Sequence, residues 1–125
     1  MAETGRHHRL ELSRGDIVVG AAQGDYGKPR PALVVQSDLF NPTHASVVIC
    51  PITSQLVDAP LFRLPIRPDL ENGLKAESQV MIDKIMAVKR ERISKKVGRI
   101  TEAEIAQVDR ALLLWLGIAG SHASF

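Results

Sequence analysis

The sequence predicts a mainly β domain, a small barrel of short strands with one helix near the C-terminus. Short apolar runs recur between clusters of Gly, Pro, Asn and Asp, which is typical of strands separated by turns. A helical capping signal followed by an apolar stripe at helical spacing appears only after residue 100. The chain has 125 residues, of which 45% are hydrophobic, and this is enough for one domain with a single core.

The expected strands cover residues 17–21, 31–36, 46–52, 61–66, 78–88 and 95–100. The run 31–36 has almost no polar alternation, which predicts that both of its faces are covered. Pro65 cannot donate to a ladder and therefore places 61–66 at an edge of the sheet. Residues 78–88 form one strand or two, and their alternation separates Val80 and Ile82 from Met81 and Asp83.

The helix has a clear start at Thr101. Glu104 follows three residues later, as in a capping box, and Ile100 and Ile105 are spaced as a hydrophobic staple. Gly117 is a natural C-terminal stop. The predicted apolar stripe consists of Ile105, Val108, Leu112, Trp115 and Leu116.

Five to seven strands with one late helix favour an SH3-like barrel. Residues 1–12 are expected to be a flexible arm, 13–118 a single domain and 119–125 a loose tail. Leu113 and Leu114 lie off the main helical stripe, so the helix has a second apolar surface that would suit a homodimer.

Composition and apolar patterning argue against a membrane-spanning, a secreted and a metal-binding protein. No run of about 18 apolar residues is present to span a membrane, and the N-terminus lacks the apolar region of a secretory signal. The single Cys50 has no disulfide partner, so we expect a cytoplasmic protein. The four histidines, His7, His8, His44 and His122, have no ligand spacing, and neither a metal nor a cofactor is expected.

Positive charge is concentrated in one segment although the net charge is only +2. This segment either forms a phosphate-attracting face or is simply a solvated surface. Its basic residues are Lys84, Lys89, Arg90, Arg92, Lys95, Lys96 and Arg99.

Arg30 lies between Pro29 and Pro31, directly before an apolar run. A residue that precedes proline is pushed into an extended conformation, so little backbone entropy remains to be lost when its guanidinium binds an anion. The planar fork of donors suits two phosphate oxygens. The alternative is an ion pair between Arg30 and a carboxylate at the barrel rim.

Several blocks together resemble the MazF/PemK family of toxin endoribonucleases. They are "RGDIV", "RPALVVQSDLFN", "VVICPITS", "GLKAESQVMIDKIMAVKRERI" and "VDRALLLWLGI", and the likeness extends from about residue 12 to residue 118. The resemblance implies an SH3-like barrel dimer of the MazF/PemK/CcdB kind. It also implies metal-independent cleavage of single-stranded RNA by 2′-hydroxyl attack, giving 2′,3′-cyclic phosphate and 5′-hydroxyl ends.

The same resemblance assigns roles to particular residues. Arg30 and Thr53 match the catalytic arginine and threonine of the family. Asp83 matches an aspartate that acts in some members as base or orienting group, but the accompanying arginine and histidine positions are Met81 and Gly24 here. The further candidates for RNA binding are Lys28, Gln36, Ser37, Ser54 and Lys84.

The resemblance also implies partners. The family pairs with an antitoxin, whose acidic flexible tail would cover Arg30, and operator DNA would be bound only together with that antitoxin. The alternative function is a CcdB-like, non-enzymatic inhibitor of DNA gyrase. That family uses a Trp-Gly-Ile ending, and this chain has Trp115-Leu116-Gly117-Ile118. We expect Trp115 to be a core or dimer residue instead.

Overall fold

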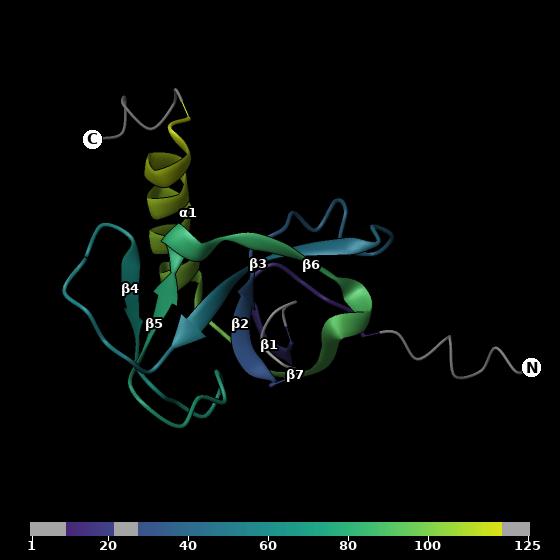
Figure 1. Ribbon diagram of the computed structural model, residues 1–125, viewed down its shortest axis with the longest axis horizontal. Helices are drawn as coiled ribbons and strands as arrows, with labels where there is room; N and C mark the ends of the chain where they lie inside the picture. The colour runs from purple at the N-terminus through teal and green to yellow at the C-terminus, as the bar shows by residue number, and fades with distance from the viewer. Residues whose placement is uncertain (1–9, 22–27, 119–125) are drawn as a thin grey trace, which may run out of the picture.

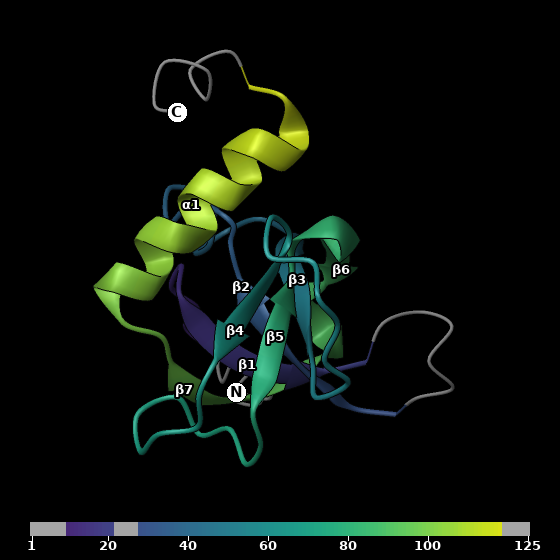
Figure 2. The same cartoon turned by 90° about the vertical axis from the view of Figure 1, so that its left-hand side faces the viewer.

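The computed structural model, which describes residues 10–21 and 28–118, shows a curved antiparallel sheet with a helix lying across it (Figures 1 and 2). The prediction of a mainly β fold with a late helix is confirmed. The elements are β1 (Asp16–Gly20), β2 (Arg30–Val34), β3 (Ser46–Thr53), β4 (Arg63–Ile66), β5 (Ser78–Met81), β6 (Met86–Lys89), β7 (Ile93–Arg99) and α1 (Glu102–Leu116), with short 3₁₀ turns η2 (Ile82–Lys84) and η3 (Arg90–Arg92).

The sheet has the strand order β4-β5-β3-β2-β1-β7, and β6 also pairs with β3. One edge of β3 pairs with β2, and its other edge pairs first with β6 and then with β5. The predicted edge position of the Pro65 strand is confirmed, because β4 ends the order. Residues 78–88 form two strands, since η2 separates β5 from β6.

Apolar side chains cover both faces of the central strands, as the run 31–36 predicts. Leu33 of β2 belongs to a core cluster that α1 covers, together with Val108 and Leu112 of that helix. Val34 points into a second cluster on the opposite face, with Val18 and Ile49. The two clusters fix which side chains of β1, β2 and β3 face away from the helix.

The helix begins as predicted. The Thr101 hydroxyl accepts a hydrogen bond from the Glu104 N–H at 3.1 Å, and the Glu104 carboxylate accepts one from the Thr101 N–H at 2.8 Å. Gly117 ends the helix in the left-handed conformation. The predicted apolar stripe is correct up to Leu112, but Trp115 and Leu116 are 46% and 54% exposed, because the helix extends past the edge of the core.

Several expected boundaries differ from the structure. The strand predicted at 31–36 ends at Val34, because the N–H groups of Val35 and Gln36 both donate to the Val48 carbonyl and interrupt the ladder. The last strand begins at Ile93, two residues early. Leu12, the last residue of the expected arm 1–12, is buried in the second core cluster.

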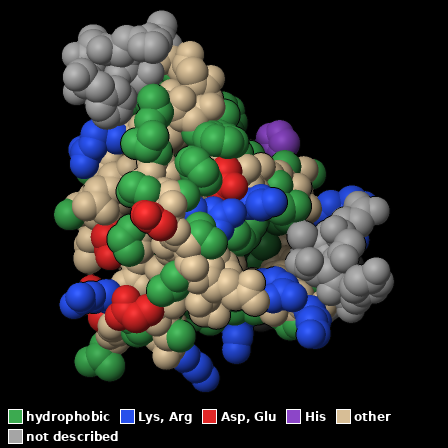
Figure 3. Space-filling view, turned by 60° about the vertical axis from the view of Figure 1, so that its left-hand side comes forward, with side chains coloured by type: hydrophobic (Ala, Val, Ile, Leu, Met, Phe, Trp, Pro, Cys, Tyr) green, Lys and Arg blue, Asp and Glu red, His purple; other side chains and the backbone are tan. Residues whose placement is uncertain are grey.

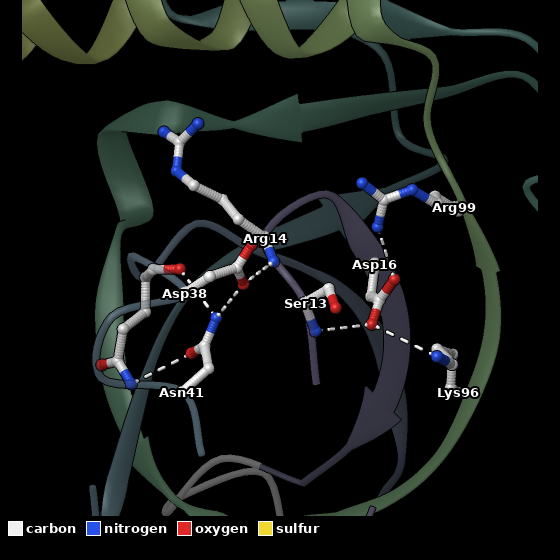
Figure 4. Close-up of polar contacts among 8 residues, drawn as sticks. Ser13, Arg14, Asp16, Asp38, Asn41, Lys96 and Arg99 are labelled. Carbon is white, nitrogen blue, oxygen red and sulfur yellow. Dashed lines mark hydrogen bonds and ion pairs between the residues drawn. The ribbon is translucent and has the colours of Figure 1, made fainter. Parts of the chain in front are cut away.

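A polar network anchors the start of β1 (Figure 4). The buried Asp16 carboxylate accepts hydrogen bonds from the Ser13 N–H and from Arg99, both at 2.8 Å. The Arg14 N–H donates to Asp38 at 2.7 Å. The Arg14 guanidinium donates to the Val35 carbonyl and pairs with Asp109 of α1. These bonds tie β1 to β7, to the turn after β2 and to the helix.

A turn at Asn72-Gly73 packs against β7. The buried Asn72 side chain accepts hydrogen bonds from the Asp69 and Leu74 N–H groups and donates to the Arg67 carbonyl. Gly73 has a φ of +72°, and a Cβ there would lie 2.3 Å from the Val97 carbonyl oxygen. Only glycine meets both constraints, so the turn fixes the connector 67–77 next to β7.

Some expectations fall outside the described residues. They concern His7, His8, Gly24, His122 and the tail 119–125. Within residues 10–21 and 28–118, the structure contains no helix with the length and apolar character that a membrane span requires.

Candidate active site

A groove of about 960 Å³ opens beside the ends of β2 and β3. Its floor is largely apolar and its polar groups are basic or neutral, and the described residues that line it include no carboxylate. The lining residues come from six strands, η2, the segment after β3 and the connector after β4: Val19, Arg30, Pro31, Pro51, Ile52, Thr53, Ser54, Gln55, Gly73, Leu74, Lys75, Ala76, Ser78, Met81, Lys84, Met86, Lys95 and Val97.

Arg30 lines this groove from the first position of β2. It pairs with Gly20 of β1, and its backbone is extended, as the following proline requires. The side chain is exposed. The arginine therefore starts a strand that is paired on both sides, and its backbone is ordered before any ligand arrives.

Thr53 lines the same groove from the last position of β3. The register between β2 and β3 pairs Ala32 with Pro51 and Leu33 with Cys50. Continuing this antiparallel register by two residues brings the backbones of Arg30 and Thr53 to the same end of the two strands. The Thr53 hydroxyl oxygen accepts a hydrogen bond from the Gln55 N–H at 3.0 Å.

Three lysines from separate elements surround these two residues. Lys84 comes from η2, Lys95 from β7 and Lys75 from the connector that the Asn72-Gly73 turn holds in place. Four cationic side chains, including Arg30, thus line one groove, and their summed charge attracts polyanions. Ser54, a predicted contact residue, also lines it.

Asp83 is not among the residues that line the groove. Its two carboxylate oxygens accept hydrogen bonds from the guanidinium of Arg63 in β4, at 2.8 and 3.1 Å. Both side chains are mostly buried. The hydrogen bonds from Arg63 hold the pKa of Asp83 below its usual range, which makes this carboxylate a weak base.

Three further candidates also lie outside the groove lining. The Gln36 amide is engaged within the turn after β2, where it bonds Asn41, the Ser46 carbonyl and the Val48 N–H. The Ser37 hydroxyl accepts from the Leu39 N–H and stabilises that same turn. Lys28 is exposed and precedes β2. Local turn chemistry explains the first two without a ligand.

The single cysteine lies in the core. Cys50 is fully buried in β3, and burial raises the pKa of its thiol to about 12. A protonated, enclosed thiol is not a nucleophile at neutral pH.

The sequence prediction missed several groove residues. Lys75, Lys95, Met86 and Gln55 were not predicted as site residues, although Lys95 was noted within the basic segment. These residues line one groove because β7 pairs with β1 and because the connector 67–77 is held next to β7. The basic segment was a usable signal for Lys95, but other members serve structure: the Arg90 guanidinium is buried and donates to the carbonyls of His44 and Asn41.

Comparison with known proteins supports one family. Residues 13–116 match the model of the PemK-like, MazF-like toxin of type II toxin–antitoxin systems. The chain is 48% identical over 110 residues to a probable endoribonuclease MazF of Mycolicibacterium smegmatis, covering 87% of this chain and 100% of that one.

Solved structures share the fold. A mycobacterial endoribonuclease in complex with its cognate antitoxin has a TM-score of 0.73 at 21% identity, covering 86% of this chain and 96% of that chain. A MazE-MazF crystal structure from Deinococcus radiodurans has a TM-score of 0.72 at 23% identity, covering 88% and 99%.

The alternative of a CcdB-like gyrase inhibitor is not favoured, because the family model describes PemK-like, MazF-like toxins and the curated relative is named as an endoribonuclease. Trp115, which suggested that alternative, packs against Phe62 with 5.4 Å between ring centroids. From residue 13 to residue 116, the chain belongs to the family of PemK-like, MazF-like toxins of type II toxin–antitoxin systems.

Proposed function

We propose that this toxin is an endoribonuclease that cuts single-stranded RNA in the groove beside β2 and β3. The observation that carries the proposal is the meeting of Arg30 and Thr53 in one groove with Lys75, Lys84 and Lys95. The curated relative at 48% identity, named as a probable endoribonuclease, supports the same activity.

The proposed reaction is attack by a ribose 2′-hydroxyl on the adjacent phosphorus. The bond from phosphorus to the 5′-oxygen breaks, which leaves a 2′,3′-cyclic phosphate on one fragment and a 5′-hydroxyl on the other. The nucleophile is part of the substrate, so the protein has to orient the RNA and to stabilise the negative charge that builds on the phosphoryl oxygens. Fixed donors aimed at such charge are usually the largest catalytic contribution.

Arg30 and Thr53 supply such donors. The Arg30 guanidinium can bond two phosphoryl oxygens at once, and it stays protonated at any working pH, so it acts through its charge and its hydrogen bonds. The Thr53 hydroxyl can donate to one of these oxygens. Lys84, Lys75 and Lys95 hold the flanking phosphates, while Ser54 offers a further hydroxyl at the same end of β3.

The partner that we propose is an antitoxin with an acidic, flexible tail. A groove with four cationic side chains, and with no carboxylate among its described lining residues, attracts such a tail as it attracts RNA. The solved mycobacterial relative in complex with its cognate antitoxin supports this partner. Occupation of the groove by the tail would cover Arg30, and operator DNA would be bound only by the toxin–antitoxin complex.

The test is incubation of the purified protein with a long single-stranded RNA in EDTA, followed by mapping of the fragment ends. We expect discrete cuts that end in 2′,3′-cyclic phosphate. Arg30→Ala should lower the cleavage rate by about 10³-fold or more while the fold is retained, because the main charge clamp is lost. Arg67→Ala is the matched control, since Arg67 is exposed outside the groove.

Two results would contradict the proposal. Intact RNA with a folded, antitoxin-free protein would exclude the activity. Cleavage by Arg30→Ala at the wild-type rate would show that the reaction takes place elsewhere.

A further inference from the structure

We infer that Gln79 is a positioning residue for the Thr53 hydroxyl, acting through the turn that follows β3. This inference rests on the proposed role of Thr53 as a donor to the phosphoryl group. Gln79 lies on β5 directly across from Thr53 in the β3–β5 ladder, and it does not line the groove.

The first step of the argument concerns the Thr53 hydroxyl itself. Its oxygen accepts the Gln55 N–H at 3.0 Å. A hydroxyl carries one proton and two lone pairs, so this bond occupies a lone pair and leaves the proton to be donated. It also restrains the side-chain torsion of Thr53. The Gln55 N–H therefore sets both the direction of the hydroxyl and its role as a donor.

The second step concerns what holds Gln55. Residues 54–58 are all exposed, so core packing does little to order this turn. The Gln79 amide bonds both backbone groups of Val57: its oxygen accepts the Val57 N–H at 3.1 Å and its nitrogen donates to the Val57 carbonyl at 2.8 Å. This side chain thus ties the turn to β5, two residues beyond Gln55.

The two steps together form a relay from β5 to the reacting group. Gln79 holds Val57, the turn holds the Gln55 N–H, and that N–H holds the Thr53 hydroxyl. Thr53, Ser54 and Gln55 line the groove, so the relay ends at the substrate although it starts outside. A donor that is oriented before the substrate binds avoids reorganisation during the reaction.

The test is a double-mutant cycle on kcat for cleavage of a short RNA that contains one mapped site. Thr53→Ala should lower kcat by about 10²-fold, and Gln79→Ala by about 10-fold with KM nearly unchanged. In the Thr53→Ala background, Gln79→Ala should lower kcat less than about twofold, because the hydroxyl it positions is already gone. Gln107→Ala on α1, which changes an exposed glutamine, is the control.

A second readout does not depend on activity. Three-bond couplings to the Thr53 methyl carbon should report one side-chain rotamer in the wild type and rotamer averaging in Gln79→Ala. If Gln79→Ala does not fold, Gln79→Glu replaces it: the carboxylate still accepts the Val57 N–H but cannot donate to the Val57 carbonyl, so we expect a smaller loss of kcat.

The outcomes separate this inference from the proposed function. The relay is supported if Gln79→Ala lowers kcat only in the protein that retains Thr53, and if the Thr53 rotamer is averaged in Gln79→Ala. An equal loss in both backgrounds, or a Thr53 rotamer unchanged in Gln79→Ala, overturns it while the proposed activity stands. Wild-type cleavage by Thr53→Ala overturns the role given to the hydroxyl, and the couplings still decide whether Gln79 positions it.

Discussion

At the scale of single residues, the type of a charged residue and its position in the sequence did not predict whether it lies in the site. Asp83 was a candidate base because of its place in the sequence, but the structure pairs it with Arg63, which is 20 residues away in the chain. Arg30 and Thr53 lie at adjacent strand ends and line one groove. The difference comes from strand pairing: Arg63 of β4 lies directly across from Met81 of β5, just ahead of η2.

The pairing with Arg63 makes Asp83 a stabilising group whose effect depends on pH. Its folded-state pKa lies below the unfolded value, so the carboxylate contributes stability above a pH of about 4, and this is lost as the pH falls through the folded pKa. We expect Asp83→Asn to lower the free energy of unfolding at pH 7 by about 2 kcal/mol, and the deficit to shrink in acid. Urea unfolding at a series of pH values measures this.

The same variant separates a structural role from a catalytic one. RNA cleavage by folded Asp83→Asn should stay within about twofold of wild type, because loss of a base would cost about 10²-fold or more. A large loss of kcat without a loss of stability would make Asp83 the base after all. Asp58→Asn, which changes an exposed carboxylate in the turn after β3, is the control.

At the scale of elements, the sequence was most informative where the signal is local. The start of α1 depends on two side chains three residues apart, and the hydrogen bonds of the capping box are those that this spacing predicts. Strand ends were less predictable. The end of β2 depends on the Val48 carbonyl of another strand, which accepts from the N–H groups of Val35 and Gln36 and which no pattern within 31–36 reveals.

The capping box gives a prediction for the helix. We expect Thr101→Ala to lower the free energy of unfolding by about 1 kcal/mol, because the Glu104 N–H loses its acceptor at an exposed helix end. Thr101→Ser should restore most of this stability, since it retains the hydroxyl. Chemical unfolding followed by circular dichroism compares the three proteins, and equal midpoints would show that the cap contributes nothing.

At the scale of the whole molecule, exposed apolar side chains occur both at the end of α1 and in the segment between β3 and β4, and Trp115 of the helix contacts Phe62 of that segment. Figure 3 shows several hydrophobic side chains in the upper part of the face that it presents. Leu56 and Leu61 of the segment between β3 and β4 are exposed, as are Leu114, Leu116 and Ile118 at the end of α1. Such a surface supports the homodimer that the second apolar face of the helix predicts.

This surface yields a prediction about assembly. We expect the wild type to have the mass of two chains by light scattering, and Leu116→Lys to have the mass of one, because a charge would be buried between two copies. Its fold should persist, since Leu116 is exposed within one chain. Leu70→Lys is the control on a fully exposed leucine away from α1. A wild-type monomer at micromolar concentration would contradict the prediction.

Features that depend on neighbours along the chain were predictable from the sequence: the mainly β class, the capped helix, the extended backbone of Arg30 and the motifs shared with the toxin family. Tertiary structure alone decided that Lys75 and Lys95 join Arg30 and Thr53, that Arg63 binds Asp83, and that Gln79 bonds the turn beside Thr53. The two groups of features differ in how far along the chain the interactions that set them reach. Capping bonds and proline sterics act within about four residues, whereas these meetings depend on strand register, which is set by burial summed over the whole sheet.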